Sequence, residues 1–233
     1  MTATSEGVLF DQAAGDYDQW YETPIGQAAD AIEKELIREA TVPWSGEAAL
    51  DLGAGTGQFS LYLARLGLQV TGVDVSAQML ARAGTKAAEA HLSCRFLQAD
   101  AAALPFPDAS FDLVTCVTAL EFFADPARAL QEAWRVLRPG GCIIVGVIHH
   151  DSAWGEIYQT AAAAGNPIFS RAHLFTREEL SGLLAQARPT LTEGLCLDPG
   201  AEPTSLEDAL GTEAQALANG ARPGFLVARW DKA

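Results

Sequence analysis

The sequence contains little positive charge and no long apolar run. Its 233 residues include 15 Lys and Arg against 30 Asp and Glu, a formal net charge of −15. This charge would repel a polyanion, so the composition argues against nucleic acid and favours a small neutral or cationic partner. No apolar stretch approaches the roughly 20 residues of a membrane span. The N-terminal MTATSEGVLFDQ lacks a basic region and a long apolar core, so we expect no secretory signal.

Cysteine is also scarce. The four cysteines, Cys94, Cys116, Cys142 and Cys196, lie far apart and form no CxxC pair. This spacing is typical of free thiols in a reducing cytosol, and it predicts neither a disulfide framework nor a zinc site. We therefore expect a cytoplasmic protein without a metal.

The length and the 49% hydrophobic content indicate one globular domain overall. From residue 48 onward, short apolar runs alternate with segments of helical periodicity. This rhythm predicts a parallel sheet with helices on both faces. We expect strands at 48–52, 68–75, 94–100, 111–117 and 142–148, and helices at 58–67, from Ser76 onward and at 126–137, the last ended by RPGG.

Past residue 150 the alternation loosens. A capping box of Thr176 and Glu179 predicts a helix over 176–187, and two last strands are expected at 190–197 and 224–230, with a weak helix near 205–218. Ahead of the sheet, DYDQWYETPIG precedes an amphipathic helix. That N-terminal part, residues 1–45, either packs on the domain of residues 46–233 or forms a lid over the strands' carboxyl ends.

Three glycines follow the first expected strand at alternate positions, Gly53, Gly55 and Gly57. A strand, a glycine loop and a helix let a ligand approach the main chain closely. Two acids strengthen this signal, because Asp74 and Asp100 end the second and third strands. Carboxyl ends of parallel strands are where open sheets bind ligands, and a carboxylate there can hold the hydroxyls of a ribose.

The spacing of the glycines argues against two common cofactors. A nicotinamide site usually has GxGxxG, whereas position 58 is Gln, and no GK[ST] motif indicates ATP. A ligand with a ribose and little negative charge suits this acidic neighbourhood, and S-adenosylmethionine (SAM) is such a ligand.

Four stretches resemble a class I SAM-dependent methyltransferase of the UbiE-like (type 11) group. They are LDLGAGTGQFSLYLARLG, VTGVDVSAQMLARA, FLQADAAALPFPDASFDLVTCVTALEFF and EAWRVLRPGGCIIVGV, spanning residues 48–148. The resemblance implies an α/β, Rossmann-like doubly wound fold with an N-terminal helical lid. Its seven strands would have the order 3-2-1-4-5-7-6, with only the seventh antiparallel.

The resemblance also implies a set of cofactor contacts. The methionine and ribose parts would be lined by Gly53, Ala54, Gly55 and Gly57, and the ribose would be held by Asp74. The adenine would pack on Val75 and Met79, and its amino edge would meet Asp100 and Ala101. Val117 would contact the methionyl end, and Asp51 would order the loop. Met79 suits helix packing equally well, and Asp51 can simply satisfy backbone donors. From the N-terminal segment, Tyr17 and Tyr21 are expected either to contact the cofactor or to pack, and Tyr17 is the first choice for a hydrogen bond to the methionyl carboxylate.

Relatives often carry His after the fourth strand, where this sequence has Glu121-Phe122-Phe123, which makes the expected pocket wall more apolar. Methyl transfer depends mainly on holding donor and nucleophile in line, and a general base helps a hydroxyl or ammonium nucleophile. The candidates are Glu121 and either His149 or His150, which follow the fifth strand. Adjacent side chains diverge, so only one histidine is expected to serve.

The sequence predicts an enzyme that methylates a small molecule and releases S-adenosylhomocysteine (SAH). A protein that binds SAM or SAH without catalysis is the main alternative, and a nicotinamide-dependent oxidoreductase is a weaker one. The expected partner is the small-molecule acceptor, with no nucleic acid and no membrane span. The chain is expected to be a monomer or a homodimer.

Overall fold

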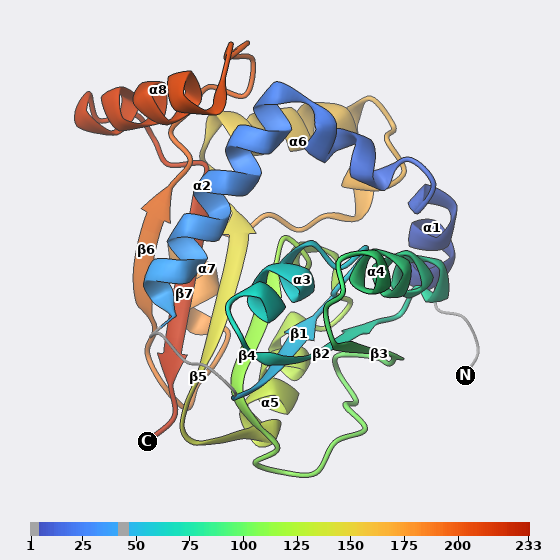
Figure 1. Cartoon of the computed structure of the whole chain (residues 1–233). Helices are drawn as coiled ribbons and strands as arrows, with labels where there is room; N and C mark the ends of the chain where they lie inside the picture. The colour runs from blue at the N-terminus through green and yellow to red at the C-terminus, as the bar shows by residue number, and fades with distance from the viewer. Residues whose placement is uncertain (1–4, 42–46) are drawn as a thin grey trace.

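A seven-stranded sheet runs through the centre of the molecule, which Figure 1 shows as a computed structural model. The structure describes residues 5–41 and 47–233. The strands are β1 (Ala48–Leu52), β2 (Gln69–Asp74), β3 (Cys94–Gln98), β4 (Phe111–Val117), β5 (Leu137–Ile148), β6 (Thr190–Gly194) and β7 (Phe225–Asp231). The expected strands are all present.

The strand order is β3-β2-β1-β4-β5-β7-β6. Strand β1 pairs in parallel with β2 and β4, whereas β7 runs antiparallel to both β5 and β6. The expected order and the single reversed strand are therefore confirmed. Because β1, β2, β3 and β4 are parallel, their carboxyl ends meet at one edge of the sheet, where the glycine loop begins.

The start of β5 differs from the expectation. The sequence RPGG was expected to separate a helix from a strand beginning at Cys142, but β5 already begins at Leu137. Gly140, with φ of 84°, donates its N–H to the Lys232 carbonyl at 2.7 Å, and the Lys232 N–H returns a bond to Gly141 at 2.9 Å. Pairing with the chain's last residues thus carries the strand through a segment that local sequence marks as a turn.

The helices are α1 (Ser5–Ala13), α2 (Pro24–Ala40), α3 (Gln58–Arg65), α4 (Ala77–Glu89), α5 (Pro126–Val136), α6 (Ala153–Ala163), α7 (Arg177–Gly182) and α8 (Leu206–Ala218), with 3-10 turns η1 (Tyr17–Glu22), η2 (Leu120–Phe122) and η3 (Phe169–Arg171). Ser76 caps α4, accepting from the Met79 N–H at 3.1 Å, and the capping box at Thr176 is present. Helix α7 ends at Gly182, five residues before the expected end. Helices α1 and α6 were not expected.

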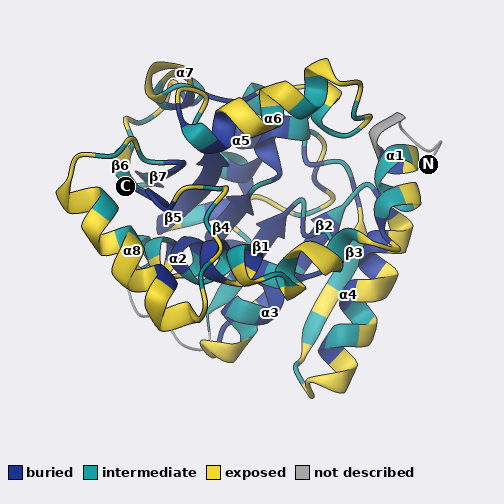
Figure 2. Cartoon of the chain, turned by 90° about the horizontal axis from the view of Figure 1, so that it is seen from above, coloured by how far each residue is buried: buried dark blue, intermediate teal, exposed yellow. Residues whose placement is uncertain are grey.

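Two apolar cores lie on opposite faces of the sheet. Helices α2 and α3 cover one face, and α5 and α7 cover the other, while Figure 2 shows buried residues concentrated at the strands between them. Ile37 of α2 is fully buried and packs in the same core as Val227 of β7. Cys116, Cys142 and Cys196 are buried, Cys94 is half-buried, and all four thiols are free, as expected.

The segment before α2 lies over the carboxyl edge of the sheet. Asp11 of α1 accepts a hydrogen bond from the Ser76 hydroxyl at 2.6 Å, and Asp18 of η1 accepts one from Thr56 in the glycine loop at 2.6 Å. Lys86 of α4 also pairs with Asp18 at 3.1 Å. The expected boundary between residues 45 and 46 lies outside the described residues, so the division into lid and domain stays a prediction.

None of the helices that the structure describes is long and apolar enough to cross a membrane.

Candidate functional site: a cavity over the glycine loop

The glycine loop follows β1, and its three glycines all have positive φ, of 68°, 52° and 86°. A Cβ at Gly53 would lie 2.4 Å from the Ala119 side chain, so this position requires a close approach of backbone. Gly57 begins α3 against Ala83, where a Cβ would lie at 3.0 Å. At Gly55 a Cβ would meet no atom nearer than 4.0 Å. The missing side chain at Gly55 therefore leaves open space, whereas at Gly53 and Gly57 it allows neighbouring side chains to pack closely.

Asp74, the last residue of β2, fixes the position of this loop. One carboxylate oxygen accepts the Gly55 N–H at 2.9 Å, and the other accepts the Ser76 N–H at 2.8 Å. Burial raises the pKa of Asp74, and these two backbone bonds oppose the rise. A carboxylate oxygen has two acceptor sites, so each keeps one for a ligand hydroxyl.

A cavity of about 280 Å³ opens beside the loop. It is lined by Phe10, Tyr17, Gly53, Gly55, Val73, Asp74, Val75, Met79, Ala99, Asp100, Ala101, Ala102, Thr118, Ala119, Phe122, Phe123, Ala124, Asp125 and Ala129. A smaller hollow of about 30 Å³ shares Tyr17, Gly53, Gly55 and Thr118 with it. Tyr21, Asp51, Ala54 and Val117 line this second hollow. Every residue expected at the cofactor lies on one of the two, except Gly57, which lines neither.

Asp51 connects the loop to the sheet and to α3. Its two carboxylate oxygens accept from Ser60 at 2.6 Å and from Thr115 at 3.0 Å. Burial raises the pKa of Asp51 to about 6, and the two hydroxyl donors oppose this rise. With both oxygens engaged by the protein, the side chain supports the strand that carries the loop.

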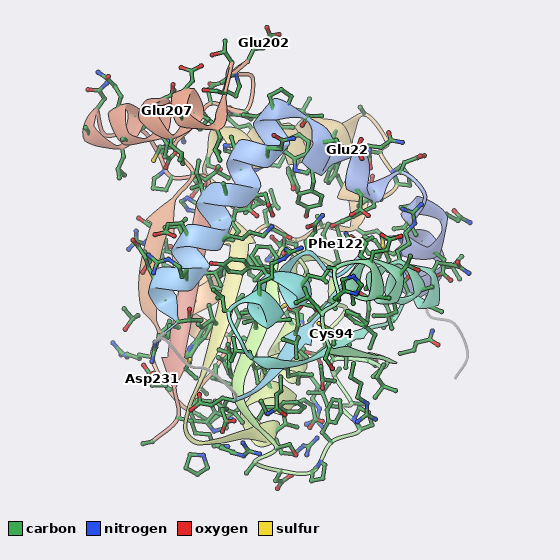
Figure 3. All side chains as sticks on the ribbon, viewed as in Figure 1. Glu22, Cys94, Phe122, Glu202, Glu207 and Asp231 are labelled. Atoms are coloured by element: carbon green, nitrogen blue, oxygen red, sulfur yellow. The ribbon has the colours of Figure 1, made fainter. Side chains whose placement is uncertain are left out.

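Two phenylalanines form the apolar wall that the sequence predicted. Phe122 and Phe123 both line the larger cavity, and Phe122 contacts Phe10 of α1 edge-to-face, with ring centroids 5.2 Å apart. In Figure 3, Phe122 lies above the ends of the strands. Thr118, directly after β4, has φ of 47°, an uncommon backbone conformation for a residue other than glycine, and it lines both cavities.

The structure brings neither candidate histidine to these cavities. His149 is half-buried, with Nδ1 3.3 Å from the Pro223 carbonyl, while its backbone forms a bridge with Phe175. His150 is exposed, and its Nδ1 lies 2.7 Å from an oxygen of Asp151. Their location after β5 was anticipated, but their side chains are held by surface partners.

Glu121, the third catalytic candidate, is buried with 2% of its surface exposed. Its Oε1 accepts the Ile148 N–H at 2.9 Å, whereas Oε2 has no partner among the described residues. Burial raises the pKa of Glu121 to about 7, and the backbone bond opposes the rise. An unpaired buried carboxylate oxygen is costly to the fold, so its retention points to a functional role.

Two further polar residues near Glu121 were missed by sequence reasoning. Glu33 on α2 is buried, and burial raises its pKa to about 8, with the charges of Asp30 and Glu121 adding to the effect. Tyr158 on α6 is half-buried, and desolvation of its hydroxyl raises its pKa well above the usual value. Glu33 could have been noticed, because it shares helical spacing with Ala29 and Ile37 on the buried face of α2.

SAM fits the residues present. The missing side chain at Gly55 leaves space against the backbone, and the Asp74 oxygens can each accept a ribose hydroxyl. Neither cavity is lined by Lys or Arg, so no cationic side chain meets the phosphates of a nucleotide. A sheet of this strand order, with a glycine loop after β1 and an acid at the end of β2, is the arrangement that defines the class I SAM-dependent methyltransferases.

The comparisons with known proteins agree with this class. Residues 50–145 match the family model described as a methyltransferase domain. A demethylmenaquinone methyltransferase of Thermus thermophilus is 49% identical over 98 residues, which are 41% of this chain and 44% of that protein. This chain thus spans less than half the length of that curated relative.

Two solved structures resemble the whole chain. A SAM-dependent methyltransferase of Thermotoga maritima, described as a possible histamine N-methyltransferase, has a TM-score of 0.77 and 26% identity, covering 98% of this chain and 100% of that one. The [4+2]-cyclase SpnF has a TM-score of 0.72 and 25% identity, covering 98% and 96%. Residues 50–145 thus match the methyltransferase domain family, and this match together with the structural neighbours implies SAM as the cofactor.

Proposed function

We propose that the protein transfers the methyl group of SAM to a small-molecule acceptor. The observation that carries this proposal is the hydrogen bond between Asp74 and the Gly55 N–H, which positions an acid and an open stretch of backbone on the same cavity. The relatives support methyl transfer as the reaction class, and their acceptors differ, so they do not identify the acceptor here.

The residues around the cavity have separate tasks in this reaction. Asp74 and Asp100 hold the nucleoside part, and the loop at Gly53–Gly55 lies against the amino-acid part. When bound, SAM supplies an electrophilic methyl group on a sulfonium. Phe10 and Tyr17 of the N-terminal segment cover the cavity and exclude water from the reacting centre. Close approach and alignment supply most of the acceleration in such a displacement.

We also propose a division of the chain and a location for it. Residues 1–45 act as the lid of a methyltransferase domain at 46–233, and the four free thiols favour a reducing cytosol. None of Glu121, His149 and His150 lines the two cavities, and Glu121 is the preferred catalytic candidate because one of its carboxylate oxygens is buried without a partner among the described residues.

Isothermal titration with SAM, SAH and NAD tests the proposal. We expect SAM and SAH to bind and NAD not to bind, which would exclude the oxidoreductase. Mass spectrometry of acceptor libraries with labelled SAM then separates an enzyme from a non-catalytic binder. The cyclase among the structural neighbours makes this second step necessary, since this fold also serves other chemistry. A protein that binds NAD but not SAH would refute the proposal.

A further inference from the structure

The segment of residues 5–22 places two aromatic side chains on the cofactor cavity, and an aspartate follows each of them directly. Phe10 and Tyr17 line the cavity. Asp11 and Asp18, the next residues, accept hydrogen bonds from the elements that surround it. The segment therefore has two similar points of attachment, one in α1 and one in η1.

Asp11 attaches α1 to the start of α4. Its Oδ1 accepts the Ser76 hydroxyl at 2.6 Å and the Gln78 N–H at 3.0 Å. Ser76 is fully buried, and its own N–H donates to the Asp74 carboxylate at 2.8 Å. Asp11 is thus connected, through one residue, to the acid proposed to hold the ribose.

Asp18 attaches η1 to the glycine loop and to α4. Its Oδ1 accepts from the hydroxyl of Thr56, which is buried, at 2.6 Å and from Nζ of Lys86 at 3.1 Å. Arg82, one turn before Lys86 on α4, donates to the Gly15 carbonyl at 2.9 Å. Charged acceptors make stronger hydrogen bonds than neutral ones. Asp18 therefore couples the position of η1 to the loop that meets the cofactor.

Burial of apolar side chains contributes little to this attachment. None of residues 8–13 and 17–22 is buried, although Ala14 between them is. The next helix, α2, differs, because its Ile32 and Ile37 lie in the core. Figure 1 shows α1 beside α4, and the two helices are in contact. Segments with little buried apolar surface open at a low free-energy cost, so the polar bonds determine how often this segment opens.

We propose that Asp11 and Asp18 form a two-point latch on residues 5–22, and that SAM and SAH enter and leave the cavity only when this latch opens. The proposal rests on the cofactor binding proposed above, and it makes both carboxylates positioning residues. Each bond of the latch joins two protein groups, so the latch holds the segment in the free protein and in the complex alike. Weakening the latch therefore raises the rates of association and release together, and affinity changes much less.

Surface plasmon resonance, with the full chain immobilised and SAH as the probe, measures both rates. Asp11→Ala and Asp18→Ala should each raise the association and dissociation rate constants by about tenfold, because hydrogen bonds to charged groups are the stronger ones in proteins. The dissociation constant should stay nearly unchanged. Asp16→Ala is the matched control, since Asp16 is exposed and its carboxylate accepts from Gln19 of the same segment at 2.8 Å. This control should behave as the wild type.

The asparagine variants distinguish the two points of the latch. One oxygen of Asp11 accepts both donors, and the amide oxygen of Asp11→Asn can do the same, so its rates should stay close to those of the wild type. The amide of Asp18→Asn carries no charge to pair with Lys86, so both of its rates should rise. These variants keep the size of the side chain, and they carry the test if an alanine variant fails to fold.

Three results would overturn the latch. Unchanged rates in either Asp11→Ala or Asp18→Ala would show that this point does not hold the segment closed. Faster release with unchanged association would mean that the carboxylates support the bound cofactor and do not control its entry. An equal increase in Asp16→Ala would mean that any change in the segment opens it. Failure of the wild type to bind SAH would instead refute the cofactor site proposed above, so the two failures are distinguishable.

Discussion

The carboxylate of Asp74 accepts the N–H of Gly55 at 2.9 Å, across 19 positions of sequence. This bond joins the end of β2 to the loop after β1, and it places the open backbone of Gly55 and the acid on one cavity. Cofactor affinity should therefore depend on Asp74 through its carboxylate and on Gly55 through the space left by its missing side chain.

Asp74→Ala should weaken SAH binding by roughly 10- to 100-fold. The ribose hydroxyls would lose a charged acceptor, and hydrogen bonds to charged groups contribute about 1.5–3 kcal/mol. Titration calorimetry measures the effect, and Asp231→Ala is a control, because Asp231 ends β7 with 61% of its side chain exposed. Unchanged affinity in Asp74→Ala would show that the nucleoside lies elsewhere.

Gly55→Val should abolish SAH binding while the protein stays folded. The new side chain would project into space that no protein atom occupies within 4.0 Å, and the positive φ would add strain of about 1–2 kcal/mol. Gly140→Val is the control, because Gly140 also has a positive φ, of 84°, and a Cβ there would meet no atom within 4 Å. Gly140 does not line the cavity, so this variant has the backbone strain without the block. Circular dichroism and calorimetry on both variants separate the two effects. Normal binding by Gly55→Val would mean that the loop is only a turn.

Residues 8–25 should exchange amide hydrogens more slowly when SAH is bound. Phe10 and Tyr17 line the cavity, and Asp18 already contacts the glycine loop through Thr56, so a ligand there would add contacts to the segment. Exchange in α8, on the far side of α2 in Figure 1, should not respond. A segment whose exchange ignores SAH would be ordinary packing and not a lid.

Glu33→Gln should stabilise the protein more at pH 8.5 than at pH 5. Burial raises the pKa of Glu33 from 4.5 in the unfolded chain to about 8 in the fold. Between these values the folded state binds the proton that the unfolded state has lost, so stability falls with rising pH, by up to about 1.4 kcal/mol for each pH unit. Glutamine removes this cost, since it mimics the protonated form.

Thermal unfolding of Glu33→Gln, Glu35→Gln and the wild type across pH 5–9 measures this difference. Only the Glu33→Gln curve should separate from the wild type, and the separation should grow above about pH 5. Parallel curves for all three proteins would show that Glu33 stays ionised in the fold.

His149→Ala and His150→Ala should each retain turnover within about threefold, and Glu121→Gln should lower it by about 100-fold or more. Glu121 has a free, buried oxygen, whereas the two histidines lie against Pro223 and Asp151. General acid–base groups typically contribute 10²–10⁴-fold to the rate. Turnover of an acceptor found in the mass-spectrometry screen, measured with saturating labelled SAM, gives the rates. A large loss in one histidine variant would restore the histidine base that the sequence suggested.

The sequence by itself determined the sheet, its helices and the cofactor side of the site. The local signals were alternating apolar runs, helix caps such as Ser76 and Thr176, and acids at strand ends. Their structural meaning depends on neighbouring residues in the sequence and not on distant contacts. Gly53, Gly55, Asp74 and Asp100, which the sequence singled out, line the larger cavity because each lies at or just after the end of a strand. Phe10 and Thr118 also line it, and no local signal in the sequence indicated them.

The tertiary structure decided which polar side chains lie inside the protein. Glu33, Glu121 and Tyr158 are separated by 88 and 37 positions, and only the packing of α2 and α6 over the end of β4 brings their charges together. The histidine pair shows the reverse case, since its place after β5 is a sequence property, whereas the direction of its rings depends on Pro223 and Asp151. Side-chain direction and burial depend on contacts between distant elements, and one-dimensional spacing does not encode them.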